Sequence, residues 1–257
     1  MNQTEQTTII GIDCATNDEK VGLSISDASP DRCVTRVARV GSKEGGVAEE
    51  VAACLVSPIR TLIALDAPLG WPRPMSESLA AHKAGEPLAV AANDLFRRAT
   101  DRFVKSRLGK QSLDVGADRI ARTAHSALKL LADLRQKTGL PIPMAWEPSY
   151  SERIAVIEVY PAATLVAHGI RDTGYKKKDQ IAERKAIMGS LERIIRLPED
   201  REAMERSADA LDAFVCVLAA FDFLRGNAEP PDDIGLARHE GWIWVLTRPH
   251  TTEVQNG

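Results

Sequence analysis

Acidic residues stand at the ends of apolar runs that are typical of buried β-strands. Asp13 and Asp66 close the runs TIIGID and LIALD, and Glu158 lies in the run IAVIEV. An unpaired carboxylate is costly in a sheet core, so acids at such positions are usually paired with a cation or bound to a metal. Because ligands gather at strand ends in open α/β sheets, these acids can meet at one point although they are far apart in the sequence.

A second acidic feature lies in a largely apolar helical stretch late in the chain. Asp209 and Asp212 are three residues apart and therefore lie on one face of a helix. Two acids on a partly buried face repel each other unless something positive lies between them. Together with the strand-end acids they predict one carboxylate site, and such hard oxygen ligands favour Mg²⁺ or Mn²⁺. The alternative is a set of unrelated caps and ion-pair partners.

Basic residues are concentrated in residues 97–110, which contain six Lys or Arg and one Asp. Such a segment could neutralise phosphates beside a metal site, with one contact per basic residue. It could equally be a solvated helix face. The run formed by Lys176, Lys177 and Lys178 is a second candidate for phosphate contacts.

The composition of the 257 residues is typical of a soluble globular protein, with 44% hydrophobic and 27% charged residues. The net charge is −3, so nucleic-acid binding would need a local basic patch. The sequence has no GxGxxG, P-loop, GxSxG, HExxH or CxxC motif. The first residues lack the features of a signal peptide, and no apolar run is long enough to span a membrane. We therefore expect a cytoplasmic protein that does not contact membranes.

The order of the expected elements indicates an α/β protein with a mixed sheet. Strands are predicted at residues 8–13, 21–26 and 33–40, which pair antiparallel, and then at 62–66, 154–159 and 242–246. Helices are predicted at about residues 46–55, 161–167, 181–195 and 201–224. We predict a single domain at residues 7–250 with a helical insertion at about residues 76–140.

Six short motifs, taken together, resemble a known family. They are GIDCA at residues 11–15, DAPLG at 66–70, RATD at 98–101, EVYPAA at 158–163, DALDA at 209–213 and EGWIW at 240–244. In this order they resemble domain-of-unknown-function family 429, which is described as predicted nucleases with an RNase H fold. The resemblance covers nearly the whole chain.

The resemblance implies an RNase H-like mixed sheet of five strands, flanked by helices, whose acids bind two divalent metal ions. Carried over to this chain, the metal ligands are Asp13, Asp66, Asp209 and Asp212, with Mg²⁺ or Mn²⁺ as cofactor. The DxxD spacing is closest to the Holliday-junction resolvase branch. Glu158 belongs to the family's EVYP motif and is expected to act as a ligand or to orient the attacking water. These five acids are the predicted catalytic residues of a metal-dependent nuclease.

The substrate is expected to be nucleic acid, either DNA or RNA. We expect Arg98 and Arg102 to hold a phosphate, Asp101 to orient one of them, and Tyr160 to contact the substrate. One alternative is a non-catalytic RNase H-like module that binds a metal or a nucleotide. A second alternative is a phosphotransferase of the actin or sugar-kinase type, although the chain lacks the glycine-rich phosphate loops of those proteins.

Overall fold

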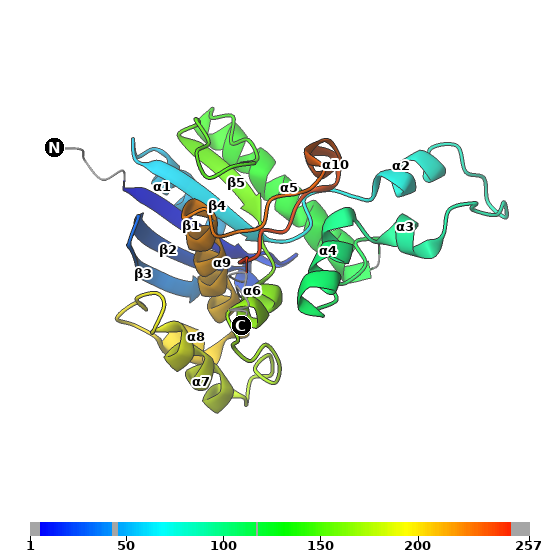
Figure 1. Cartoon of the computed structure of the whole chain (residues 1–257). Helices are drawn as coiled ribbons and strands as arrows, with labels where there is room; N and C mark the ends of the chain where they lie inside the picture. Colours follow the sequence, from blue (N-terminus) through cyan, green and yellow to red (C-terminus); the bar gives the residue numbers. More distant parts are fainter. Residues whose placement is uncertain (1–5, 43–45, 117, 248–257) are drawn as a thin grey trace, which may run out of the picture.

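A mixed sheet of five strands forms the centre of the structure, a computed structural model that describes residues 6–42, 46–116 and 118–247 (Figure 1). The strands are β1 (Thr7–Asp13), β2 (Gly22–Ser29), β3 (Arg32–Val40), β4 (Arg60–Asp66) and β5 (Ile154–Glu158). They lie in the order β3-β2-β1-β4-β5. The first three pair antiparallel, and β4 is parallel to both β1 and β5. The predicted α/β class and the mixed five-stranded sheet are therefore confirmed, and the arrangement is consistent with an RNase H-like fold.

Helices cover both faces of this sheet. They are α1 (Val47–Leu55), α2 (Arg73–Leu79), α3 (Ala92–Phe96), α4 (Ala99–Leu108), α5 (Asp118–Thr138), α6 (Pro161–Ala167), α7 (Ile181–Leu191), α8 (Glu202–Arg206), α9 (Ala208–Leu224) and α10 (Ile234–Glu240). Figure 1 shows α9 lying across one face of the sheet and α5 on the other side, while α2 and α3 extend away from it.

Two hydrophobic cores, one on each face, explain why the central strands are continuous apolar runs rather than alternating ones. Ile9 contributes to the core that contains α9. Its neighbour Ile10 points the other way, into the core that contains residues of α1 and α5. Both side chains are completely buried. The sheet is thus fixed on both sides, and its strand ends are held in place for a site.

Helix α9 approaches β1 very closely, and Gly11 in β1 makes this possible. A Cβ atom at Gly11 would lie 2.1 Å from the backbone oxygen of Ala213 in α9. No real side chain tolerates such a distance, so any other residue would push the helix away from the sheet. The position of α9 against β1 therefore depends on this glycine.

We expect Gly11→Ala to lower the free energy of unfolding by about 3 kcal/mol, the upper range for overpacking a core. Gly189→Ala is the matched control, because Gly189 is an exposed residue of α7 whose added Cβ would meet no atom within 4 Å. That change should stabilise the protein by up to about 1 kcal/mol through helix propensity. Urea denaturation of both variants measures this difference. Equal midpoints would show that α9 can move without cost.

The helical regions are more broken than predicted. The insertion predicted as helical at about residues 76–140 overlaps α2 to α5. These helices are separated by residues 80–91, 97–98 and 109–116, and the structure describes no helix in these segments. The prediction of one continuous helix at residues 201–224 was wrong. Ser207 interrupts it and caps α9, its side chain accepting a hydrogen bond from the Asp209 backbone N–H at 3.1 Å. Ser at such a position favours the start of a new helix.

The C-terminal part also differs from the prediction. Helix α10 was not predicted, and Asp233 caps it by accepting a hydrogen bond from Leu236 N at 2.9 Å. The strand predicted at residues 242–246 was wrong, because Ile243 makes only an isolated bridge to Glu158. Residues 248–250 of the predicted domain lie outside the described residues.

Candidate active site

Asp13 and Asp66 end the neighbouring strands β1 and β4 and are direct partners in the strand register. Since the two strands are parallel, both carboxyl groups lie at the same edge of the sheet. Burial raises the pKa of Asp13, and the charges of Asp212 and Asp66 raise it further. Burial and then Asp212 raise the pKa of Asp66 to about 7. The two strand ends thus place two carboxyl groups side by side in a poorly solvated position.

Helix α9 brings its acids to the same edge. Asp212 is completely buried, and burial raises its pKa. Asp209 lies in the first turn, next to β2, where a Cβ at Gly22 would lie only 2.0 Å from the Asp209 backbone oxygen. Gly22 is the register partner of Asp13, so the first turn of α9 lies beside the end of β1. We call Asp13, Asp66, Asp209 and Asp212 the acidic cluster.

A lysine of the chain itself contacts the cluster, and Lys20 also lies near enough to lower the pKa of Asp209, which burial raises. Lys176 forms an ion pair with Asp212, and the Tyr175 hydroxyl donates a hydrogen bond of 2.7 Å to the same carboxylate. The charge of Lys176 also lowers the pKa of Asp13 and Asp66, against the larger effect of burial. Among the residues that the structure describes, no group of three or more His, Cys, Asp or Glu side chains is arranged to hold a metal ion. The acids are close enough to influence one another, but they do not converge on one point.

The raised pKa of Asp66 predicts how stability depends on pH when no metal is present. Between its usual value of 3.8 and about 7, the folded protein keeps a proton that the unfolded chain releases. The free energy of unfolding should therefore fall as pH rises through this window. Urea denaturation in a chelator should give a flatter pH profile for Asp66→Asn than for the wild type. Asp31→Asn, at an exposed turn between β2 and β3, should keep the wild-type slope. Identical slopes in all three proteins would contradict the assignment.

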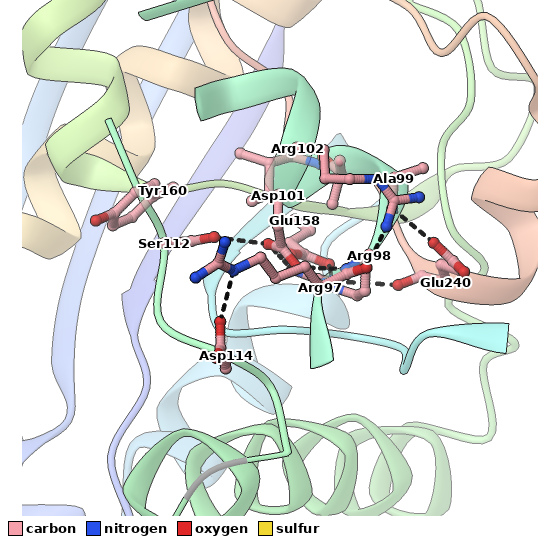
Figure 2. A network of polar contacts seen from close by, with 12 residues as sticks. Arg97, Arg98, Ala99, Asp101, Arg102, Ser112, Asp114, Glu158, Tyr160 and Glu240 are labelled. Atoms are coloured by element: carbon pink, nitrogen blue, oxygen red, sulfur yellow. Dashed lines mark hydrogen bonds and ion pairs between the residues drawn. The ribbon is translucent and has the colours of Figure 1, made fainter. Parts of the chain in front are cut away.

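Glu158 belongs to a different group of charges, shown in Figure 2. Its two carboxylate oxygens lie 2.7 and 2.9 Å from the Nη2 and Nη1 atoms of Arg98. Arg98 also bonds both oxygens of Asp101, at 3.0 and 3.1 Å, and donates to the backbone oxygen of Glu240 at 3.1 Å. The side chains of Arg98, Asp101 and Glu158 are at most 2% exposed. We call these four residues the Arg98 network.

This network changes the roles expected for three of the predicted site residues. Both oxygens of Glu158 are engaged by Arg98, so its geometry does not make it a metal ligand. The buried guanidinium of Arg98 is turned toward carboxylates and cannot reach a phosphate at the surface. Asp101 does orient Arg98, as expected, but toward Glu158 rather than toward a substrate. The sequence motifs RATD and EVYP meet here as an internal ion-pair network that fixes α4 against β5.

The remaining predicted substrate residues are accessible. Arg102 is 45% exposed, and its guanidinium donates a 2.7 Å hydrogen bond to the Arg97 backbone oxygen. Tyr160 is partly buried at the start of α6, and Figure 2 shows it pointing away from the Arg98 network. Burial and then the charge of Asp66 raise the pKa of Tyr160 to about 12. Tyr160 therefore lies at the rim of the acidic cluster, whereas Arg102 lies on α4.

Sequence reasoning missed Tyr175 as a partner of the site and considered Lys176 only as part of a basic run. A signal was present, since a tyrosine directly follows Gly174 and directly precedes three lysines. Nothing in the sequence pointed to Asp212 as the residue they contact, which is 36 positions from Lys176. Such long-range pairing is visible only in the folded chain.

Comparisons with known proteins identify one family. The sequence model of a family described as "Protein of unknown function (DUF429)" matches residues 6–234. No curated protein sequence matches the chain significantly, and no solved structure does. In the part of the chain that the structure describes, none of the helices is both long and apolar enough to cross a membrane.

Proposed function

The chain belongs to the DUF429 family, and from that premise, together with the acidic cluster, we propose that it is a metal-dependent nuclease that hydrolyses phosphodiester bonds of nucleic acid. The observation that carries this proposal is the meeting of β1, β4 and α9 at one edge of the sheet. Asp13, Asp66 and Asp212 come from these three elements. The charge of Asp212 raises the pKa of both Asp13 and Asp66, and Asp66 also raises that of Asp13. Perturbed titratable groups at strand ends are a common mark of functional sites.

The chemistry of the donors fits a divalent cation. Carboxylate oxygens are the ligands that Mg²⁺ and Mn²⁺ prefer, and the excess of negative charge favours a cation in the cluster. Asp13, Asp66, Asp209 and Asp212 would hold it. When bound, the metal ions would activate a water and stabilise the leaving oxygen. Lys176 already supplies one positive charge, which supports the view that the cluster needs a counter-ion.

Other residues of the chain would bind and orient the substrate. Tyr160 lies near enough to Asp66 for that charge to raise its pKa. Its hydroxyl is 3.5 Å from the backbone oxygen of Gln111, and this weak contact would leave it free to bond a phosphate or a sugar. Arg102 offers an exposed positive charge on α4. Each such contact would add affinity that falls as the salt concentration rises.

A second candidate is a non-catalytic module, and one observation favours it. Asp212 contacts Lys176 and Tyr175, and no three acids in the described residues are arranged around one point. An Asp212 carboxylate that is already paired with the chain's own lysine would not require a metal ion. It could hold the fold together or bind a nucleotide without turnover.

A substrate panel separates the two candidates. The purified chain is incubated with labelled single-stranded and double-stranded DNA, RNA, a branched DNA junction and a simple phosphodiester, with Mg²⁺, Mn²⁺ or a chelator. The nuclease proposal expects cleavage of at least one substrate that requires the metal. Metal binding without turnover on any substrate would favour the binding module. Cleavage that the chelator leaves unchanged would contradict a metal-dependent mechanism.

A further inference from the structure

Lys176 reaches a completely buried carboxylate from the protein surface. Its side chain is 60% exposed, while that of Asp212 is not exposed at all. More than half of the lysine side chain is therefore in solvent. Its flexible four-carbon stem has the rotational freedom to carry the ammonium group away from Asp212.

The backbone around Lys176, by contrast, is held firmly. Arg184 of α7 is completely buried and donates hydrogen bonds to three carbonyl oxygens of this loop. They are the oxygens of Tyr175 at 2.5 Å, Lys177 at 2.7 Å and Lys178 at 2.9 Å. Lys176 lies between these anchored residues. A change at this point therefore involves the side chain of Lys176 and not its loop.

The remaining partner of Asp212 strengthens this view. Tyr175 is buried, and its hydroxyl donates a hydrogen bond to Asp212. Tyr175 can therefore stay in place whether the other oxygen of Asp212 faces an ammonium group or another cation. Lys176 bonds the second oxygen, Oδ2, whereas Tyr175 bonds Oδ1. One oxygen of Asp212 thus has a fixed partner, and the other has a partner that can leave.

We propose that Lys176 is a built-in counter-ion of the acidic cluster, which a divalent cation must displace from Asp212 in order to bind. This inference rests on the proposed metal-dependent function and adds that Lys176 competes with the metal ion for Asp212. An ammonium group and a divalent cation on the same oxygen of Asp212 would repel each other at short distance, so Lys176 disfavours metal binding there for as long as it stays. The ammonium group balances the charge of Asp212 while no metal is present, and the free energy needed to move it away lowers the affinity for metal.

The test is calorimetric titration of Mn²⁺ into the wild type, Lys176→Met and Lys177→Met. Methionine keeps most of the length of the lysine side chain and removes its charge. Lys177 is an exposed neighbour, and only its backbone oxygen contacts Arg184, so Lys177→Met is the matched control. We expect Lys176→Met to bind Mn²⁺ about tenfold more tightly than the wild type, which corresponds to about 1.4 kcal/mol. The control should bind like the wild type.

Thermal melting provides an independent readout. In a chelator, Lys176→Met should melt at a lower temperature than the wild type, because the buried cluster has lost its counter-ion. Mn²⁺ should then raise its melting temperature more than that of the wild type. If the methionine variant does not fold, Lys176→Gln, which can still donate a hydrogen bond to Asp212, carries the same expectation.

The outcomes distinguish this inference from the proposed function. Tighter Mn²⁺ binding in Lys176→Met, or Mn²⁺ binding in that variant alone, supports competition between Lys176 and the metal. If the wild type binds Mn²⁺ and Lys176→Met binds it equally or more weakly, the competition is overturned and the proposed function stands. Absence of Mn²⁺ binding in all three proteins overturns both.

Discussion

Replacing Asp13 by Asn is expected to reduce metal-dependent hydrolysis by more than about 100-fold. Even residues that only support a metal ligand commonly contribute 10- to 100-fold, and Asp13 would itself be a ligand. It stands at the centre of the site, since Asp66, Asp209 and Asp212 all affect its pKa. The measurement is kcat/KM on whichever substrate of the panel is cleaved.

This loss should not come from unfolding. Burial raises the pKa of Asp13 because its charged form is poorly solvated, so the neutral amide removes a destabilising charge. We expect Asp13→Asn to be at least as stable as the wild type in a chelator. Asp31→Asn, which changes the same charge at an exposed turn, should retain full activity. Full activity in Asp13→Asn would rule out the proposed mechanism.

The second large effect concerns the Arg98 network and stability. Arg98→Met should lower the free energy of unfolding by about 3–5 kcal/mol, because it leaves buried carboxylates without their cation. The carboxylates are those of Glu158 and Asp101, which are 2% and 1% exposed. Urea denaturation monitored by circular dichroism measures the change.

The adjacent arginine is the matched control. Arg97 is 33% exposed and pairs with Asp114, which is 39% exposed. Exposed pairs of this kind contribute at most about 1 kcal/mol, so Arg97→Met should be nearly neutral. Adding Glu158→Gln to Arg98→Met should restore part of the lost stability, because it removes one of the unpaired charges. Similar losses in Arg97→Met and Arg98→Met would show that burial of the network is not what makes it important.

The sheet and the first acids could be predicted because their signals are local. A continuous run such as TIIGID is required of a strand that is buried on both faces, and the acid that closes it marks the strand end. Asp13 and Asp66 therefore lie where the sequence predicted, side by side in the register. Asp209 and Asp212 of α9 could be added to the predicted site because helical spacing places both on one side of the helix.

The partners of charged residues could not be predicted in the same way. Arg98 and Glu158 are 60 residues apart, and nothing in either local sequence indicates that they form a buried pair. Residues 97–110 were interpreted as one basic segment, but Arg98 points into the protein whereas Arg97 and Arg102 remain partly exposed. Side-chain burial within a charged helix depends on tertiary packing, which a single sequence does not reveal.

The predicted helix boundaries were wrong where short polar residues act as caps. Ser207 begins α9 and Asp233 begins α10, each by accepting a backbone hydrogen bond. Both residue types are common in loops as well as at caps, so their presence alone does not distinguish a helix start from a turn. The break before α9 matters for function, because it brings Asp209 into the first turn of the helix beside β2.

The most direct test of the central claim is calorimetric titration of Mn²⁺ into the wild type and Asp13→Asn, both checked for folding. The claim is that the acidic cluster binds a divalent cation. It predicts saturable binding to the wild type and loss of that binding in Asp13→Asn. No binding to the wild type, or equal binding to both proteins, would contradict it and leave these acids as partners of Lys176 and Tyr175 in a metal-free fold.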